Sequence, residues 1–358
     1  MPYFPYVPII GIITKLFLAV YLFAYSPIAW AGAIIWILVG FLIFFVYSRG
    51  HLREKEIKEE TRLVKEERKP TERPYEVLVP IANPIHTERL SKIGERIAKE
   101  KNGEVIVTTI VTVPEQTPLD EGHRYISKEQ KEILKEVDEY IEDVPVRKIT
   151  AVGHDVGKSI TNLAYEKDVD LILLGWRGKR KRFSDYFLGS TIDYVVENAP
   201  CDVSVAKAME EYKPEKILIP VAGGRNVELS ESIAKSFAKK YDSEIILVNV
   251  FEKGEKKANN LLDKHKRHLI EEGLDKVENV AIREKKGVAD DIIEYAEDRD
   301  VDMIVLGATE KGLIPSALFG NVPEEIGERF DKQVIMVKKH QRIKSYFNKI
   351  MRKIVGKF

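Results

Sequence analysis

The chain has 358 residues, and its 57 Lys and Arg residues balance 57 Asp and Glu residues, so the formal net charge is zero. The charge is unevenly distributed, because residues 1–48 carry only Lys15 while residues 338–358 carry eight Lys and Arg and no acid. This distribution argues against a uniformly basic nucleic-acid-binding protein, so we expect no nucleic-acid partner. The single cysteine, Cys201, excludes an intrachain disulfide and is typical of a reducing compartment.

Residues 1–48 contain two apolar runs, at about 7–25 and 28–47, each long enough to cross roughly 30 Å of hydrocarbon. The intervening Ser26 and Pro27 are typical of a tight turn. No cation precedes the first run and a second run follows at once, which disfavours a cleaved signal peptide. We therefore predict an α-helical transmembrane hairpin over residues 1–48.

Cations follow the second run immediately, at Arg49, His51, Arg53 and Lys55. Such residues collect on the cytoplasmic side of a membrane. We expect a protein of the cell membrane, with both termini and the soluble domains in the cytoplasm. Lys15 lies inside the first run, where an ionisable side chain either reaches the interface or faces other helices.

The next stretch, residues 49–74, alternates in charge and contains many Glu and Lys pairs at spacings of three and four. This pattern predicts a solvated, charged helical linker that ends at Pro70 and Pro74. A surface for a specific partner is the alternative interpretation.

The rest of the chain contains an internal duplication. Short sequences recur at nearly constant offsets of 140, 132 and 131 residues, which indicates two copies of one domain. The recurring pairs are VLVPIAN and ILIPVAG at Val77 and Ile217, VDLILLG and VDMIVLG at Val169 and Val301, and DVSVAK and QVIMVK at Asp202 and Gln333. We place the first domain at residues 75–207, a linker at 208–215 and the second domain at 216–338.

Within each copy, near-continuous apolar strands alternate with amphipathic helices. This alternation indicates a parallel sheet that is covered on both faces. We predict the α/β class, with two tandem doubly wound parallel-sheet domains after the transmembrane hairpin. In such sheets, ligands bind at the carboxyl ends of the strands, where the strand order reverses.

The sequence after the fourth strand of the first copy, GWRGKRKRFSDYFLGST, predicts a phosphate site. Its glycines allow tight turns, and the free backbone N–H groups at the start of the following helix bind anions. A basic run between the glycines adds positive charge. The spacing supports an alternative equally well, namely a simple turn in which the basic run faces solvent or the membrane. The residues concerned are Gly175, Arg177, Gly178, Arg180, Gly189, Ser190 and Thr191.

Two polar residues, His154 and Asp155, follow the third strand of the first copy, where they could contact the same ligand. A turn followed by a helix cap is the alternative. The second copy keeps the glycine scaffold but loses the basic run, and Glu310 stands where an anion would approach. We expect weaker phosphate binding there, at Gly307, Gly312, Gly320 and Asn321.

The duplicated module resembles the universal stress protein family. Its nucleotide-binding members are similar in carrying GxxG, nine residues and then GS or GT after the fourth strand, and the first copy has GWRG, ten residues and GS. The resemblance implies an adenine nucleotide, ATP or AMP, with no required metal, and pairing of the two domains through edge strands. The ATP-binding branch has an Asp after the first strand, where this chain has Ala82 and Asn83, and in the second copy Ala222 and Gly223.

The amino end resembles the last two transmembrane helices of amino acid permeases of the amino acid/polyamine/cation superfamily, in its cationic amino acid transporter-like branch. Some prokaryotic permeases of this kind carry tandem universal stress protein domains, and IANPIHTERL, GHDVGKSI and LLGWRG are similar to that attached type. The resemblance implies a permease helix bundle as partner, either encoded separately upstream or forming the preceding part of one longer polypeptide. Two helices cannot form an alternating-access pathway, so the chain is not a complete transporter.

The last segment, residues 339–358, has apolar residues at helical spacing, with Lys and Arg largely on the other face. This pattern predicts a basic amphipathic helix on an anionic membrane surface. Packing of this helix on the protein itself is the alternative.

No catalytic motif is present in the sequence: it contains no Walker lysine motif, no GxSxG and no metal-spaced His and Cys cluster. We predict that the protein is not an enzyme, with a weak ATPase as the alternative. Our leading hypothesis is a membrane-anchored cytoplasmic regulatory module that senses an adenine nucleotide and belongs to, or associates with, an amino acid permease. The other hypothesis is a self-standing membrane-anchored stress-response protein that binds nucleotide without a transport partner.

Overall fold

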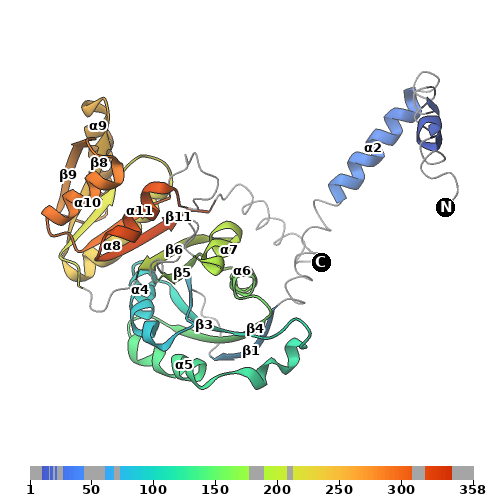
Figure 1. The fold of residues 1–358 in the computed structure, drawn as a ribbon, viewed down its shortest axis with the longest axis horizontal. Helices are drawn as coiled ribbons and strands as arrows, with labels where there is room; N and C mark the ends of the chain where they lie inside the picture. Colours follow the sequence, from blue (N-terminus) through green and yellow to red (C-terminus); the bar gives the residue numbers. More distant parts are fainter. Residues whose placement is uncertain are drawn as a thin grey trace. The chain divides into compact units, whose positions relative to one another are not determined.

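The structure is a computed structural model that describes residues 10–15, 17–18, 21, 27–43, 61–67, 73–176, 189–207, 213–308 and 319–340. It has two units, one made of Met1–Glu59 with Ile350–Phe358 and the other of Glu60–Lys349. The first unit contains helix α2 (Pro27–Ile43), drawn in blue in Figure 1. Among the described residues, no helix combines the length and apolar character needed to cross a bilayer, so the transmembrane hairpin stays a prediction.

The second unit contains two α/β domains that were predicted from the duplication. The first consists of β2 (Glu76–Pro80), α4 (Thr87–Glu100), β3 (Glu104–Thr112), α5 (Lys128–Tyr140), β4 (Val146–Gly153), α6 (Val156–Lys167), β5 (Leu171–Trp176), α7 (Ser190–Asn198) and β6 (Asp202–Lys207). The second consists of β7 (Lys216–Pro220), α8 (Asn226–Tyr241), β8 (Glu244–Phe251), α9 (Glu255–Glu271), β9 (Val277–Arg283), α10 (Val288–Asp298), β10 (Met303–Gly307), α11 (Asn321–Arg329) and β11 (Gln333–Lys338).

The strands form one eleven-stranded sheet in the order β1-β4-β3-β2-β5-β6-β11-β10-β7-β8-β9. Within each domain, β2 to β6 and β7 to β11 pair in parallel, which confirms the doubly wound arrangement. The strand order reverses between β2 and β5 in the first domain and between β7 and β10 in the second. Each reversal is the position at which such sheets bind ligands.

The two domains meet at β6 and β11, which pair antiparallel from Lys207 beside Val334 to Val203 beside Lys338. Side chains add to this junction: Lys207 Nζ donates to the carbonyl of Phe330 at 2.6 Å, and Asp202 Oδ1 accepts from the His340 N–H at 2.8 Å. The sheet therefore continues from one domain into the other.

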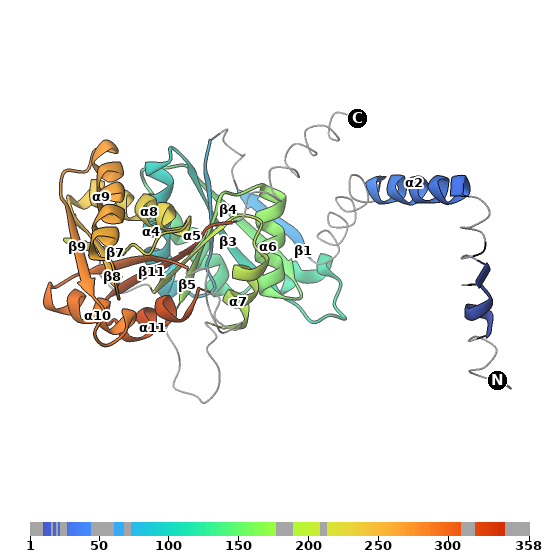
Figure 2. The ribbon, with the colours of Figure 1, turned by 90° about the horizontal axis from the view of Figure 1, so that it is seen from above.

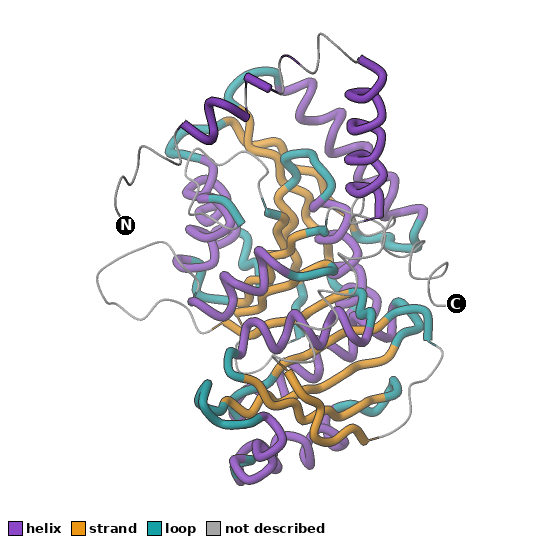
Figure 3. Tube along the Cα trace, turned by 90° about the vertical axis from the view of Figure 1, so that its right-hand side faces the viewer, coloured by secondary structure: helices purple, strands orange, loops and turns teal. Residues whose placement is uncertain are grey.

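Helices cover both faces of the sheet (Figures 2 and 3). On one face, α4, α5, α8 and α9 contribute buried residues such as Ile93, Ile133 and Phe237 to a core that extends through both domains. On the other face, α6, α7, α10 and α11 do the same with residues such as Ile160 and Ile292. The near-continuous apolar strands are buried between these two layers, as their composition predicts.

Residues 61–67 form a strand, β1 (Thr61–Glu67), where the alternating charges predicted a helix over residues 49–74. β1 pairs antiparallel with β4, which would otherwise be the edge of the first domain's sheet. Pairing provides partners for the backbone groups of that edge, and this gain outweighs the weak helix preference of the segment. The helical linker was therefore wrong for these residues, and residues 49–60 and 68–72 lie outside the described residues.

Polar side chains also hold β1. Thr61 is buried and its Oγ1 accepts from Asn162 Nδ2 at 3.2 Å. Glu66 lies 2.8 Å from Lys167 Nζ and 3.5 Å from the guanidinium of Arg147, which is only 3% exposed. These contacts anchor the strand to α6 and to β4.

Arg147 also lies beside two carboxylates of the neighbouring strands, Glu76 at 2.7 Å and the fully buried Glu104 at 2.6 Å. Burial raises the pKa of Glu76 from 4.5 to about 7; Glu104 and Asp170 add to this shift and Arg147 opposes it. The cluster around Arg147, which Glu66 of β1 also joins, thus contains a carboxyl group that titrates near neutral pH.

This titration makes the stability of the protein depend on pH. Because the folded chain holds the Glu76 proton more tightly than the unfolded chain, the free energy of unfolding falls as pH rises from about 4.5 to about 7. We expect the native protein to lose on the order of 1–3 kcal/mol relative to Glu76→Gln between pH 5 and pH 8 in urea unfolding followed by circular dichroism. The exposed Glu67→Gln serves as control, and parallel profiles for native protein and E76Q would refute this assignment.

Candidate functional site

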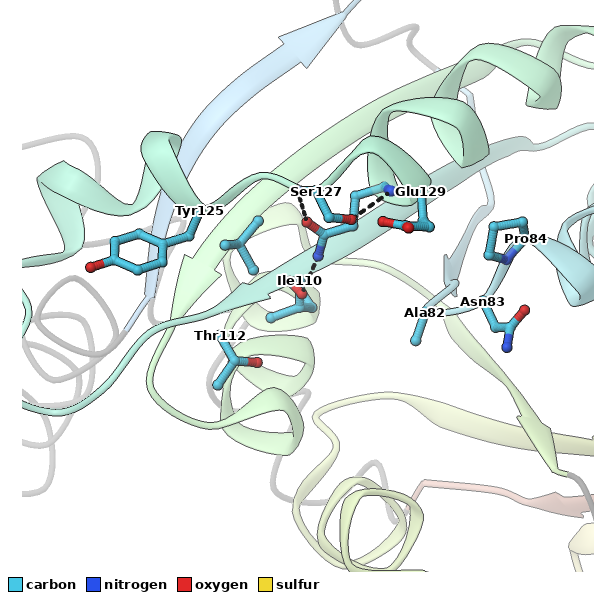
Figure 4. A pocket seen from close by; sticks show the side chains of 10 residues that line it. Ala82, Asn83, Pro84, Ile110, Thr112, Tyr125, Ser127 and Glu129 are labelled. Atoms are coloured by element: carbon cyan, nitrogen blue, oxygen red, sulfur yellow. Dashed lines mark hydrogen bonds between the residues drawn. The ribbon is translucent and has the colours of Figure 1, made fainter.

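A pocket of about 500 Å³ opens at the carboxyl ends of β2 and β3, beside the reversal of strand order in the first domain (Figure 4). It is formed by the residues after β2, the end of β3 and the segment that leads into α5. The lining residues are Ala82, Asn83, Pro84, Ile110, Val111, Thr112, Tyr125, Ser127, Glu129 and Gln130. Two of them, Ala82 and Asn83, were candidates from the sequence.

The side chain of Asn83 shapes the start of the loop after β2. Its Oδ1 accepts from the Ile85 N–H at 3.0 Å and caps the 3-10 helix η2 (Pro84–His86), which begins with a proline. An Asx cap of this kind fixes the backbone immediately after the strand. Asn83 therefore has a structural role at the pocket, and its amide nitrogen is the group left to contact a ligand.

The other wall is held by a capping box at the start of α5. Ser127 Oγ accepts from the Gln130 N–H at 3.1 Å, and Gln130 Oε1 accepts from the Ser127 N–H at 3.0 Å. Gln130 Nε2 donates to the carbonyl of Ile110 at 3.0 Å, so the helix start is tied to the end of β3 (Figure 4). The pocket wall is thus preorganised by hydrogen bonds.

Charge in this pocket is negative. Hydrogen bonds from its own backbone N–H and from Ser127 hold the pKa of Glu129 below its usual value, so this carboxyl is ionised at neutral pH. The described lining residues include this one carboxylate and no cation. Hydroxyl and amine donors of a ligand fit here, whereas phosphate groups do not.

His154 and Asp155 are both held by hydrogen bonds within the protein. His154 Nδ1 lies 3.1 Å from the carbonyl of Val113, which follows the end of β3. Asp155 is the N-cap of α6, and its Oδ1 accepts from the Lys158 N–H at 2.8 Å. The helix-cap alternative is therefore correct for Asp155, and neither residue lines the pocket.

The predicted phosphate residues of the first domain are only partly described. Gly175 has ordinary backbone geometry, and a Cβ there would lie 2.9 Å from Leu90 Cδ1, so close packing against α4 accounts for this glycine. Gly189 precedes α7 with φ 128° and ψ 143°, a conformation nearly restricted to glycine. Ser190 and Thr191 form the first turn of α7. Arg177, Gly178 and Arg180 lie outside the described residues.

In the second domain, side chains of the protein itself occupy the equivalent edge. A Cβ on Gly307 would lie 2.5 Å from the Cβ of Asn226, whose amide donates to the Ala308 carbonyl at 2.6 Å and accepts from the Lys339 N–H at 2.8 Å. Gly223 lies after β7 with φ 86°, beside Ala222.

The helix start of the second domain also has an internal anion. Gly320 precedes α11 with φ 96°, and Asn321 is the first helical residue. Glu324, which is buried, accepts from the Phe319 N–H at 3.3 Å through Oε1. A carboxylate thus takes the position at which a helix start would bind phosphate. Gly312 lies outside the described residues.

Sequence reasoning did not identify Ile110, Thr112, Ser127, Glu129 or Gln130. The signal for Ile110 and Thr112 was available, because they end the second strand of the domain at the carboxyl edge. The signal for the α5 residues was the capping box Ser127 to Gln130, a pattern that marks a helix start but not a ligand site. Among the described residues, no group of three or more His, Cys, Asp or Glu is placed to hold a metal ion.

The conformation of Gly189 gives a testable consequence. Replacing it by alanine adds a Cβ that meets no described atom within 4 Å, so the expected loss of about 1–3 kcal/mol comes from backbone strain alone. Ser190→Ala, one residue further and exposed, should change the unfolding free energy by less than about 0.5 kcal/mol. Equal stability of both variants in urea unfolding would contradict the strained helix start.

Comparison with known proteins agrees with this architecture. Residues 75–207 and 214–338 each match the universal stress protein family. The chain is 30% identical over 150 residues to the Na⁺/H⁺ antiporter NhaS5 of Synechocystis, a match that covers 41% of this chain and 21% of the antiporter. It is 25% identical over 155 residues to a universal stress protein of Methanocaldococcus jannaschii, covering 35% of this chain and 95% of that protein.

A solved structure shows the same fold. The crystal structure of a universal stress protein from Archaeoglobus fulgidus superposes with a TM-score of 0.55 and 20% identity, over 75% of this chain and 98% of that one. The antiporter match, in contrast, spans only about a fifth of that relative's length. Since the family match covers most of the chain, the protein belongs to the universal stress protein family and carries two tandem domains of it.

Proposed function

We propose that the protein is a membrane-anchored cytoplasmic regulatory module in which the first domain senses an adenine nucleotide. The observation that carries this proposal is the asymmetry between the two sheet edges. The first domain has a pocket of about 500 Å³ at the carboxyl ends of β2 and β3, whereas in the second domain Asn226 bonds across the ends of β10 and β11 and Glu324 bonds at the start of α11. One nucleotide per chain is the expected stoichiometry.

The chemistry of the pocket supports a division of the nucleotide between two places. The ionised Glu129, the Asn83 amide and the Ser127 hydroxyl can bind the hydroxyl and amine groups of a nucleoside. The phosphates would lie toward the start of α7, which Gly189 precedes, and the basic residues between Arg177 and Arg182 would supply positive charge. A separation of negative and positive regions is what a nucleoside phosphate requires.

The attachment to a transport protein is the second part of the proposal. The matched relative in Synechocystis carries its similar segment within a much longer antiporter chain, which supports a role for such domains beside a transporter. The predicted hairpin and the permease resemblance of residues 1–48 specify an amino acid permease as the partner. The module would regulate this partner and would not itself catalyse a reaction.

Calorimetric titration of the full chain in detergent micelles with ATP and AMP tests the nucleotide site. We expect one nucleotide per chain, and loss of at least tenfold in affinity, about 1.4 kcal/mol, for Thr112→Trp, which fills the pocket. The matched control is Glu252→Trp, because Glu252 follows β8 at the position equivalent to Thr112 and is also exposed. Two nucleotides per chain, or equal effects of T112W and E252W, would contradict the proposed asymmetry.

The same titration also tests where the phosphates of the nucleotide bind. The double variant Arg180→Ala with Lys181→Ala should weaken ATP by about 1.5–3 kcal/mol for each charge-assisted hydrogen bond that the substitutions remove, and AMP less. Unchanged affinity for ATP would exclude the basic run as the phosphate site. Absence of heat with every nucleotide would leave the first domain as a protein-interaction domain.

The transporter partner is tested by purification of the native chain from its own membranes in mild detergent, followed by native and intact mass measurement. We expect this 41.0 kDa chain to be bound to a multispanning protein, or to form the end of a larger polypeptide. A lone monomer or dimer would instead favour a self-standing, membrane-anchored stress-response protein.

A further inference from the structure

A second pocket, of about 260 Å³, lies between the two domains, away from the nucleotide pocket. The first domain contributes residues that precede β2, follow α4 and begin β6, and the second contributes α8, the end of α9 and the residue after β11. None of its lining residues lines the first-domain pocket, although the Lys339 N–H also bonds to Asn226. Its volume is below the roughly 300–1,000 Å³ of pockets for drug-sized ligands, so it suits a small metabolite.

The most informative residue in this pocket is Glu231 on α8. Its side chain is 2% exposed, and its Oε1 lies 2.7 Å from Nδ1 of the buried His265. Its other oxygen, Oε2, is buried and has no hydrogen-bond partner among the described residues. Buried carboxylate oxygens are almost always paired, so this atom indicates a missing donor.

A cation in the same pocket also lacks a partner. Lys101 follows α4 and is half-buried, and its ammonium forms no ion pair within 4 Å among the described residues. Burial lowers the pKa of Lys101; the nearby Lys235 adds to this effect, and Glu272 and Glu100 oppose it. A carboxylate bound beside Lys101 would offset both the burial of its ammonium and the repulsion from Lys235.

The other charged groups of the pocket are satisfied within the protein. Lys235 pairs with Glu272 and with Glu100, which is 3.0 Å away, and Lys339 Nζ lies 2.5 Å from Glu228 Oε2. Their charges therefore need no ligand. The groups left over are one carboxylate oxygen and one ammonium, of opposite charge.

We propose that this pocket binds a small zwitterion of the α-amino acid class, with its ammonium on Glu231 Oε2 and its carboxylate on Lys101. A simple amine would leave Lys101 unpaired, and a simple carboxylate would leave Glu231 unpaired. His268 lines the same pocket and its ring makes no hydrogen bond with the described residues, so it provides a second contact for the ligand carboxylate. Because Lys101 and Glu231 belong to different domains, the ligand would bridge the junction.

The test is calorimetric titration of the full chain in detergent micelles with glycine, L-alanine, L-leucine, L-arginine and L-aspartate. We expect at least one of them to bind, and the matching amine or carboxylate alone, methylamine or acetate for glycine, to bind at least tenfold more weakly. Glu231→Gln keeps the size of the side chain and Lys101→Met keeps its length. Each should weaken the amino acid at least tenfold.

Matched controls separate binding from folding. Glu271→Gln and Lys131→Met change exposed residues of α9 and α5 outside the pocket and should leave amino acid affinity unchanged. ATP titration of E231Q and K101M should give the native result, because the nucleotide pocket shares no residue with this one. A variant that no longer unfolds cooperatively in urea, followed by circular dichroism, is misfolded, and the other variant then decides.

Two outcomes would overturn the proposal. One is the absence of binding for all five amino acids in a chain that still unfolds cooperatively. The other is amino acid binding that neither E231Q nor K101M weakens. Either result can occur whether or not nucleotide binds, so the two proposals fail independently.

Discussion

The antiparallel pairing of β6 with β11 determines where ligands can bind in this protein. Strands within each domain are parallel, so the pairing makes all five strands of one domain run opposite to those of the other. The carboxyl edge of the first domain and that of the second therefore lie at opposite ends of the continuous sheet. Each carboxyl edge instead lies beside the amino edge of its neighbour at the junction, which explains why the inter-domain pocket combines Asp202, at the start of β6, with Lys339, just after β11.

The two ends of this junction differ because their side chains differ. At the carboxyl end of β6, Lys207 bonds to the Phe330 carbonyl, and the ring of Trp176 packs so closely on α11 that a Cβ on Gly327 would lie 2.8 Å from it. At the other end, polar residues line a pocket. The ligand edges differ too: a pocket opens after β2 and β3 in the first domain, and Asn226 ties the end of β10 to the end of β11 in the second. The two copies of the domain therefore differ in a few polar side chains at their edges.

Much of this architecture could be predicted from the sequence, because it depends on repeated apolar patterns. The offsets near 131 and 140 residues located both domains, and the apolar strands fixed the class of sheet. The roles of single residues were harder to predict. Gly175 suggested ligand contact but is explained by Leu90, which lies 85 positions earlier in the chain. The closing contacts of Asn226 join residues more than 80 positions apart, and no local pattern indicates them.

The wrong prediction at residues 61–67 has a consequence for how the chain is connected. A charged helix would have been a separate spacer between the amino-terminal segment and the first domain. A strand hydrogen-bonded along β4 and held by Glu66 to Arg147 and Lys167 is instead part of the sheet itself. The chain thus enters the first domain at Thr61 as an edge strand.

This edge strand is close to the ligand pocket in the order of the sheet. Only β4 and β3 separate β1 from β2, and the carboxyl ends of β2 and β3 form the open pocket. At the other edge, β9 is the last strand of the sheet within the described residues, and it lies in the second domain. The domain with the open pocket is thus the one whose edge strand follows the amino-terminal segment in the chain.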